Sequence, residues 1–170
     1  FREFATLVML LAPGALVTRS ALERFAWFCY GFGVWDIFYY VWLKALLDWP
    51  ASLATPDLLF LIPVPWVGPV WAPCVISLGL ILRGSTVRPL YLVDGWAWAW
   101  LGIGAVLLIL SFVIDPWLRE LQMEAFPQAT DLSAASTYLP DSFPWPWFAL
   151  GCMFAMIGMT RIFRRGCLPP

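Results

Sequence analysis

The sequence predicts an all-α membrane protein: a polytopic transmembrane helical bundle of about five spans, with a short proline-broken half-helix on its outer side. Of its 170 residues, 62% are hydrophobic and 12% are charged, whereas a soluble domain carries about 25% charged residues. Its mean hydropathy is +0.79. The apolar residues gather in five segments long enough to enter a bilayer. We therefore treat residues 1–170 as a single transmembrane domain.

The first two apolar segments cover residues 4–17 and 20–48. The first is short for a hydrocarbon core of about 30 Å, and it contains Pro13, so we expect it to be truncated or kinked. The second opens with Ser20-Ala-Leu-Glu23, which is the pattern of a capping box. At about 1.5 Å per residue, the second segment is long enough to cross the bilayer and protrude.

The approach to the third segment is apolar but is repeatedly interrupted by proline. Thr55-Pro56-Asp57 favours a helix start, and proline ends such a helix after about two turns. We predict a half-helix in the outer leaflet, followed by the third segment at 68–82. Irregular backbone at this depth either packs against protein groups or lines a small ligand cavity. The residues that define this broken segment are Asp57, Pro63, Pro65, Trp66 and Gly68.

The fourth and fifth segments cover residues 93–114 and 147–163, with an outer loop at 115–146 between them. Asp115-Pro116 resembles a helix start, because an N-cap oxygen is followed by proline at the first helical position. We therefore expect residues 117–126 to form a separate short helix on the membrane surface.

Small and aromatic residues predict how the helices pack. Gly151, Ala155 and Gly158 put small side chains on one face of the fifth segment, which suits close helix contact. The chain also carries 12 tryptophans. We interpret them as interfacial anchors, or as an aromatic surface for lipid, quinone, carotenoid or another subunit.

Positive charges set the predicted orientation, because cytoplasmic loops carry an excess of lysine and arginine. Five crossings with a cytoplasmic C-terminus put seven cations inside and three outside. We therefore predict a multi-pass protein of the bacterial cytoplasmic (inner) membrane. The inner cations are Arg19, Arg24, Arg83, Arg88, Arg161, Arg164 and Arg165, and the outer ones are Arg2, Lys44 and Arg119.

Asp36 lies near the middle of the second segment, where an ionised aspartate costs at least about 2.5 kcal/mol on insertion scales. Helical spacing puts Asp36, Tyr40 and Lys44 on one face, with Gly33 allowing another helix to approach. We expect Tyr40 to donate to Asp36, and Lys44 to reach the interface or pair with Asp48. Two interpretations stay open: a protonatable carboxylate in a proton or ion path, or a buried hydrogen-bond hub.

The residue content argues against several kinds of cofactor, metal and catalytic site. The chain has no histidine, which excludes histidine-ligated haem or metals and histidine-dependent catalytic pairs. Its four cysteines form no C-x-x-C pair; we expect small apolar residues, with a disulfide between Cys74 and Cys152 as the alternative. A net charge of −1 does not indicate the basic surface that binds nucleic acid. We expect no metal and no covalent cofactor, but bound lipid, with quinone or carotenoid as further options.

Part of the sequence resembles a known family. The strings WDIFYY from Trp35, WPASL from Trp49 and DLLFLIPVPWVGPVWAP from Asp57 are similar to those of a family of uncharacterised bacterial integral-membrane proteins. The resemblance covers about the first half of the chain. It implies an inner-membrane location and carries no established activity.

The small size and aromatic surface favour a non-catalytic accessory or scaffold subunit of a larger bacterial membrane complex, respiratory or photosynthetic. Its expected partners are membrane lipids and other membrane subunits. The alternative is a small proton- or ion-coupled transporter or channel that uses Asp36 and the broken segment. A membrane enzyme acting on lipid or quinone lacks paired catalytic groups, so we do not expect an enzyme.

Overall fold

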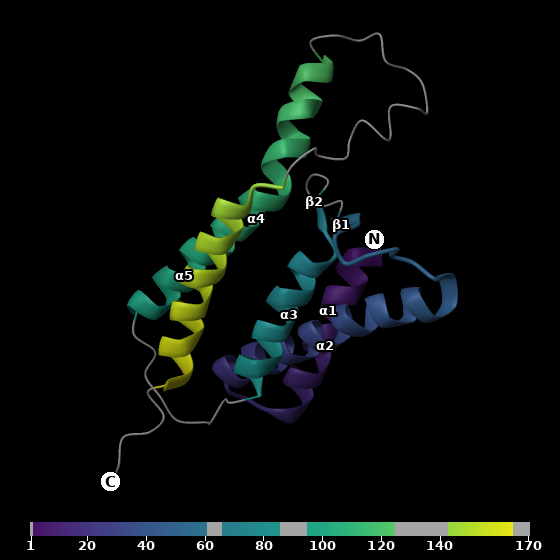
Figure 1. The fold of residues 1–170 in the computed structure, drawn as a ribbon. Helices are drawn as coiled ribbons and strands as arrows, with labels where there is room; N and C mark the ends of the chain where they lie inside the picture. The colour runs from purple at the N-terminus through teal and green to yellow at the C-terminus, as the bar shows by residue number, and fades with distance from the viewer. Residues whose placement is uncertain (1, 61–65, 86–94, 125–142, 165–170) are drawn as a thin grey trace.

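The computed structural model describes residues 2–60, 66–85, 95–124 and 143–164 (Figure 1). This part of the chain is mostly helical, as the sequence predicts, but it also contains a two-stranded antiparallel sheet. The predicted all-α class therefore accounts for the helices but misses the two strands. The elements are α1 (Arg2–Val17), α2 (Ala21–Leu47), β1 (Pro56–Phe60), β2 (Trp66–Pro69), α3 (Trp71–Gly84), α4 (Gly95–Glu124) and α5 (Trp145–Arg164).

Within the described ranges, one helix is long and apolar enough to cross a membrane by itself. This is the Gly95–Asp115 part of α4, with 21 residues and a mean hydropathy of 2.3. Only 22% of its most apolar window is buried inside the protein, so most of its apolar surface faces outward. Phe4–Val17 and Trp71–Gly84 are apolar but shorter.

The predicted half-helix in the proline-rich approach is wrong, because these residues form a β-hairpin. β1 pairs antiparallel with β2, and Pro56 lies opposite Pro69. Proline holds the residue before it in extended conformations, and a helix of two turns is marginal, so the backbone groups pair between strands instead. The paired prolines stand at strand ends, where a missing N–H is tolerated. Pro63 and Pro65 lie outside the described residues.

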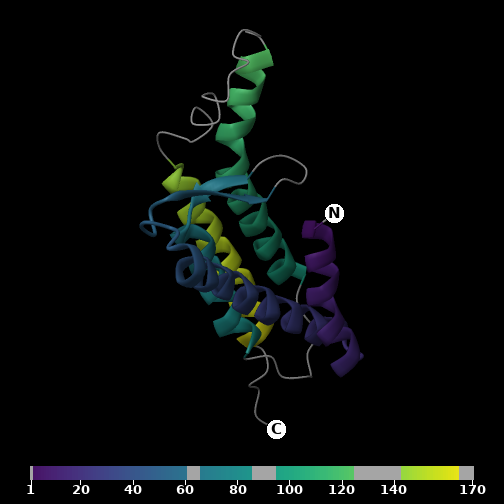
Figure 2. The ribbon, with the colours of Figure 1, turned by 90° about the vertical axis from the view of Figure 1, so that its right-hand side faces the viewer.

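The predicted helix break at Asp115-Pro116 is also wrong, because α4 continues through both residues to Glu124. Proline removes one helical hydrogen bond and crowds the preceding turn, which bends a long helix without necessarily ending it. Figures 1 and 2 show α4 changing direction along its length. Residues 117–124 therefore belong to α4 and not to a separate surface helix, and residues 125–126 lie outside the described residues.

Helix contacts sort the helix ends into two groups. The end of α1, the start of α2, the end of α3, the start of α4 and the end of α5 lie together, low in Figure 1. We call this the arginine end, because it carries Arg19, Arg24, Arg83 and Arg161. The contacts that define it are Gly14 with Arg24, Gly84 with Ala26, Phe25 with Trp98, and Gly158 with Leu101.

The opposite end, the hairpin end, holds β1, β2 and the starts of α3 and α5. Its core is an aromatic cluster in which Phe112 of α4 packs against Phe143 and Phe148. The ring of Trp66 in β2 stacks on Phe112 with centroids 6.5 Å apart. These rings bury apolar area and anchor the hairpin to α4.

Candidate functional site

Two side-chain hydrogen bonds connect α2 to its neighbours. Asp36 and Tyr40 lie one turn apart on α2, and each exposes 7% of its surface. Ser77 of α3, which is 1% exposed, donates its hydroxyl to Asp36 Oδ2 at 2.8 Å. Tyr40 donates its hydroxyl to Oδ2 of Asp57 in β1, also at 2.8 Å. We call Ser77, Asp36, Tyr40 and Asp57 the polar chain.

The prediction that Tyr40 donates to Asp36 is wrong, because the single hydroxyl proton of Tyr40 goes to Asp57. Asp36 and Asp57 still lie within electrostatic range of each other, and Tyr40 interacts electrostatically with both carboxylates. A second carboxylate therefore lies within electrostatic range of the buried one. The sequence did not reveal this neighbour, because a helix start at Asp57 would not bring it to α2.

The β-hairpin positions Asp57. Asp57 pairs with Gly68 across the two strands, and its Oδ1 accepts a hydrogen bond from the Leu58 N–H at 2.8 Å. A Cβ at Gly68 would lie 2.6 Å from the ring of Phe112, so glycine lets the strand sit directly on that ring. The aromatic cluster thereby fixes the hairpin, and the hairpin presents Asp57 to Tyr40.

Lys44 lies on the same side of α2 but outside the polar chain. Its ammonium is 2.7 Å from Asp48 Oδ1 and donates to the Pro50 carbonyl at 3.2 Å. The hydrogen bond and positive charge of Lys44 lower the pKa of the exposed Asp48 carboxyl. Asp48 itself ends α2 in a left-handed conformation, with φ of 51°. Lys44 therefore stabilises the helix end rather than the buried carboxylate.

Close packing of α2 on α3 separates the polar chain from the arginine end. A Cβ at Gly33 would lie 2.6 Å from the Ser77 carbonyl oxygen. Further along the same contact, a Cβ at Gly84 would lie 3.0 Å from the Ala26 carbonyl. The most exposed member of the polar chain is Asp57, which is half-buried at the hairpin end.

Gly151, Ala155 and Gly158 lie on the face of α5 that meets α4. A Cβ at Gly158 would be 2.5 Å from the Leu101 nitrogen, and one at Gly151 would be 2.9 Å from the Leu108 nitrogen. Gly104 faces Ala155 from α4, where an added Cβ would be 2.3 Å from the Ala155 nitrogen. These residues form a helix contact rather than a ligand site.

Two features that the sequence suggests, a Cys74–Cys152 disulfide and a capping box at Ser20, are not formed. Cys29, Cys74 and Cys152 carry free thiols, so the alternative of a Cys74–Cys152 disulfide is wrong. Ser20 is the N-cap residue of α2 but makes no side-chain cap hydrogen bond. Glu23 instead accepts a hydrogen bond from Thr18. The capping box is therefore not formed.

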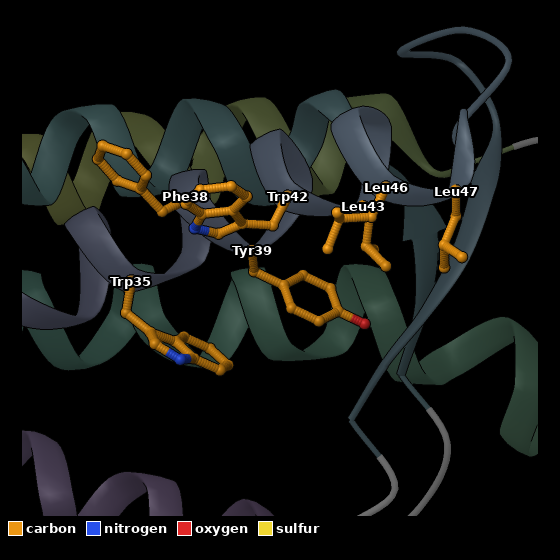
Figure 3. Close-up of a pocket in the computed structure, with 7 residues that line it drawn as sticks. All are labelled: Trp35, Phe38, Tyr39, Trp42, Leu43, Leu46 and Leu47. Carbon is orange, nitrogen blue, oxygen red and sulfur yellow. The ribbon is translucent and has the colours of Figure 1, made fainter.

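A groove of about 430 Å³ runs along the outward face of α2 (Figure 3). Trp35 and Tyr39 stack there with ring centroids 5.9 Å apart, while Trp42 is 59% exposed. All the lining residues belong to one helix, so the groove is a surface feature and not an internal cavity. They are Trp35, Phe38, Tyr39, Trp42, Leu43, Leu46 and Leu47.

Ser77 is the site residue that sequence reasoning missed. It is the sole hydroxyl residue in α3, and a lone hydroxyl in an apolar helix is a natural donor for a buried acid on the next helix. The sequence therefore offers Ser77 as a donor, but it does not specify which face of α3 meets α2. Within the described ranges, no group of three or more histidine, cysteine, aspartate or glutamate residues could hold a metal ion.

Comparisons with known proteins do not place the chain in a family. No family model matches it, and no curated protein or solved structure is detectably similar. The chemistry of the site therefore follows from its geometry. A buried carboxylate, a phenol and a half-buried carboxylate can hold helices together by hydrogen bonds, or can exchange a proton.

Proposed function

We propose that the chain is a multi-pass protein of the bacterial inner membrane, with all its helices in the bilayer. Support comes from the alternation of helix ends between the arginine end and the hairpin end. It also comes from large apolar side chains left exposed along the helices, such as Leu16, Leu46 and Val106. Exposing so much apolar surface to water would be unfavourable by about 25 cal/mol per Å².

The charge asymmetry between the two ends supports an orientation with the C-terminus in the cytoplasm. The arginine end carries several exposed arginines, whereas Lys44 at the hairpin end is paired with Asp48. Excess basic charge is retained on the cytoplasmic side. Reporter fusions after Ser85 and after Ser52 test this: we expect a cytoplasmic signal from the first and a periplasmic signal from the second.

Within that membrane, we infer that the chain is a non-catalytic accessory or scaffold subunit of a larger complex, in a respiratory or photosynthetic setting. The observation that carries this proposal is the outward aromatic face of α2. Phe38 and Trp42 are 52% and 59% exposed, and with Trp35 they line a groove formed by α2 residues, which suits a flat apolar partner. Bound lipid fills such surfaces where no subunit covers them, and quinone or carotenoid has the same flat apolar chemistry.

Purification from native membranes in a gentle detergent tests the subunit proposal. We expect stoichiometric recovery with a larger complex, identified by mass spectrometry and by its haem or pigment absorption. Replacing Trp35 and Trp42 with alanine should weaken that association. The matched control is Trp96→Ala, at an exposed tryptophan of α4 that does not line the groove. Recovery of the wild-type chain alone, or as a homo-oligomer, would overturn the proposal.

A second candidate function is a proton-coupled transporter, and one observation favours it. Asp57 gives Asp36 the second carboxylate that a relay needs, with the Tyr40 hydroxyl bonded to Asp57. Transport would also require the α2–α3 contact at Gly33 to open, because that contact separates the polar chain from the arginine end. An accessory subunit would not need this contact to open.

Flux measurements in liposomes separate the two functions. Under the transporter function, Asp36→Asn abolishes proton-coupled flux, because the amide cannot carry the proton. The control is Asp48→Asn, which removes an exposed carboxylate paired with Lys44. Under the subunit function, the wild-type chain supports no flux, and Asp36→Asn changes stability or assembly alone.

A further inference from the structure

Two exposed arginines flank the turn that joins α1 to α2. Arg19 lies in the turn itself, and Arg24 lies in the first turns of α2. Arg24 donates from Nε to the Thr18 carbonyl at 2.9 Å, which holds its guanidinium beside the turn. Neither arginine has an ion-pair partner in the part of the chain that the structure describes.

The nearby acid does not form a salt bridge with these arginines. Glu23 accepts a hydrogen bond from the Thr18 hydroxyl, and Thr18 also receives the Arg24 bond through its carbonyl. Glu23 and Arg24 therefore bond to different atoms of Thr18, the hydroxyl and the carbonyl, and not to each other. Two guanidinium groups against one carboxylate leave the turn with net positive charge.

Aromatic side chains lie next to this charge. Trp27 and Tyr30 are exposed on α2, and their rings meet edge to face with centroids 6.5 Å apart. Exposed tryptophan and tyrosine beside arginine are typical of the headgroup level of a membrane, where each has an apolar body and a polar tip. Trp96 and Trp98 are exposed at the start of α4, at the same end.

The lysine at the hairpin end, Lys44, has a different environment. Lys44 is paired with Asp48 and with a backbone carbonyl. The carboxylate of Asp57 adds negative charge at that end. At the arginine end, by contrast, Arg19 and Arg24 form no such ion pair with a described acidic residue, so an anionic ligand is attracted there.

We propose that the α1–α2 turn binds the phosphate of an anionic phospholipid, with Arg19 and Arg24 as the phosphate-binding residues. This rests on the membrane location proposed above. The planar guanidinium group binds phosphate with paired N–H donors. The anionic cytoplasmic leaflet supplies that phosphate at the depth where Trp27 sits. The acyl chains of the same lipid lie against the exposed apolar surface of α2.

Native mass spectrometry of the purified chain tests this, after incubation in micelles of equal phosphatidylglycerol and phosphatidylcholine. We expect the wild-type chain to retain phosphatidylglycerol over phosphatidylcholine by about fivefold or more, the effect of one arginine near an anionic surface. Arg19→Gln with Arg24→Gln should remove the preference. Lys44→Gln, at the hairpin end, should keep it. High salt should reduce the preference, because surface charges are screened.

Two further measurements distinguish loss of the site from misfolding and from binding of a soluble anion. Arg19→Gln alone removes a side chain that makes no hydrogen bond recorded in the structure, so it should fold normally and lose part of the preference. Glycerol 3-phosphate carries a phosphate group without acyl chains, and we expect it not to displace the lipid. Displacement by glycerol 3-phosphate would instead identify a soluble anion as the ligand and overturn the lipid assignment.

The proposal is overturned if the wild-type chain retains both lipids equally, or if the double variant keeps the preference. Failure of the membrane location is seen separately, by release of the chain from native membranes with alkaline carbonate. A chain that resists carbonate but shows no lipid preference is a membrane protein without this site.

Discussion

Ser77 of α3 contacts Asp36 of α2 through its hydroxyl, at 2.8 Å, in a position from which both side chains are almost completely removed from solvent. The carbonyl of the same serine limits the space at Gly33, one turn away on α2. One residue of α3 therefore satisfies the buried carboxylate and sets the distance between the two helices. Hydrogen bonding and close packing are coupled at this point, so a change in either should affect both.

Ser77→Ala should lower the free energy of unfolding by about 1–3 kcal/mol, because it leaves a buried carboxylate without its donor. The measurement is thermal or denaturant unfolding of the purified protein in detergent. Ser85→Ala is the control, since Ser85 is exposed and bonds the Leu82 carbonyl locally. Equal stability of the two variants would contradict a structural role for the Ser77–Asp36 bond.

The α4–α5 contact offers a matched pair of glycines. Gly104→Ala should destabilise the protein by about 1–3 kcal/mol, because the new Cβ would overlap the Ala155 backbone. Gly102→Ala meets nothing within 4 Å, and alanine is favoured over glycine in a helix by up to about 1 kcal/mol. Unfolding measurements should therefore move in opposite directions for the two variants. The same direction for both would mean that the helices do not pack as described.

The sequence predicts the helices better than it predicts the connections. Each predicted apolar segment overlaps a helix, because long apolar runs with few breakers have one favourable backbone state. Residues 117–124 show where the prediction fails. A proline after an aspartate has the same pattern at a helix start and at a bend inside a longer helix, so Asp115-Pro116 could not distinguish them.

The polar chain shows a second limit of sequence reasoning. Asp36 and Tyr40 are local neighbours on one helix, so spacing identifies their shared face. Their partners, Ser77 and Asp57, are distant in sequence and depend on which face of α3 meets α2 and on the hairpin. The pairing of β1 with β2 is a non-local arrangement, and proline-rich apolar sequence is compatible with a broken helix as well.

Tyr40→Phe should loosen the hairpin without disturbing Asp36. The variant loses the bond to Asp57, worth about 1 kcal/mol for a half-buried acceptor that water can satisfy. Hydrogen–deuterium exchange should become faster in β1 and β2, while α3 stays protected. Tyr30→Phe, at an exposed tyrosine near the arginine end, is the control. Unchanged exchange in the hairpin would show that the aromatic cluster alone holds it.

The Lys44–Asp48 pair predicts a pH dependence at the end of α2. Lys44 lowers the pKa of Asp48 in the folded protein, so the pair is stabilising above the ordinary aspartate pKa of about 3.9. Its contribution is lost as pH falls through the lowered value, when the carboxylate becomes protonated. Exchange at the C-terminal turn of α2 should be faster in Lys44→Met than in the wild type at pH 7. The difference should become smaller in strong acid, where only the bonds from Lys44 to backbone carbonyls remain, and a difference that does not shrink would contradict the ion pair.

Gly33→Ala should separate α2 from α3, because its Cβ would lie 2.6 Å from the Ser77 carbonyl, which is backbone and cannot move aside alone. We expect a loss of about 1–3 kcal/mol. Gly31→Ala is the matched control two residues away, where the nearest atom is a leucine methyl at 3.9 Å. Separation would also stretch the Ser77–Asp36 bond, so a second substitution, Ser77→Ala, should cost less in the Gly33→Ala background than in the wild type. Additive effects would mean that packing and hydrogen bonding at this contact act independently. In that case, opening the contact for proton transfer would not require the Asp36 bond to break.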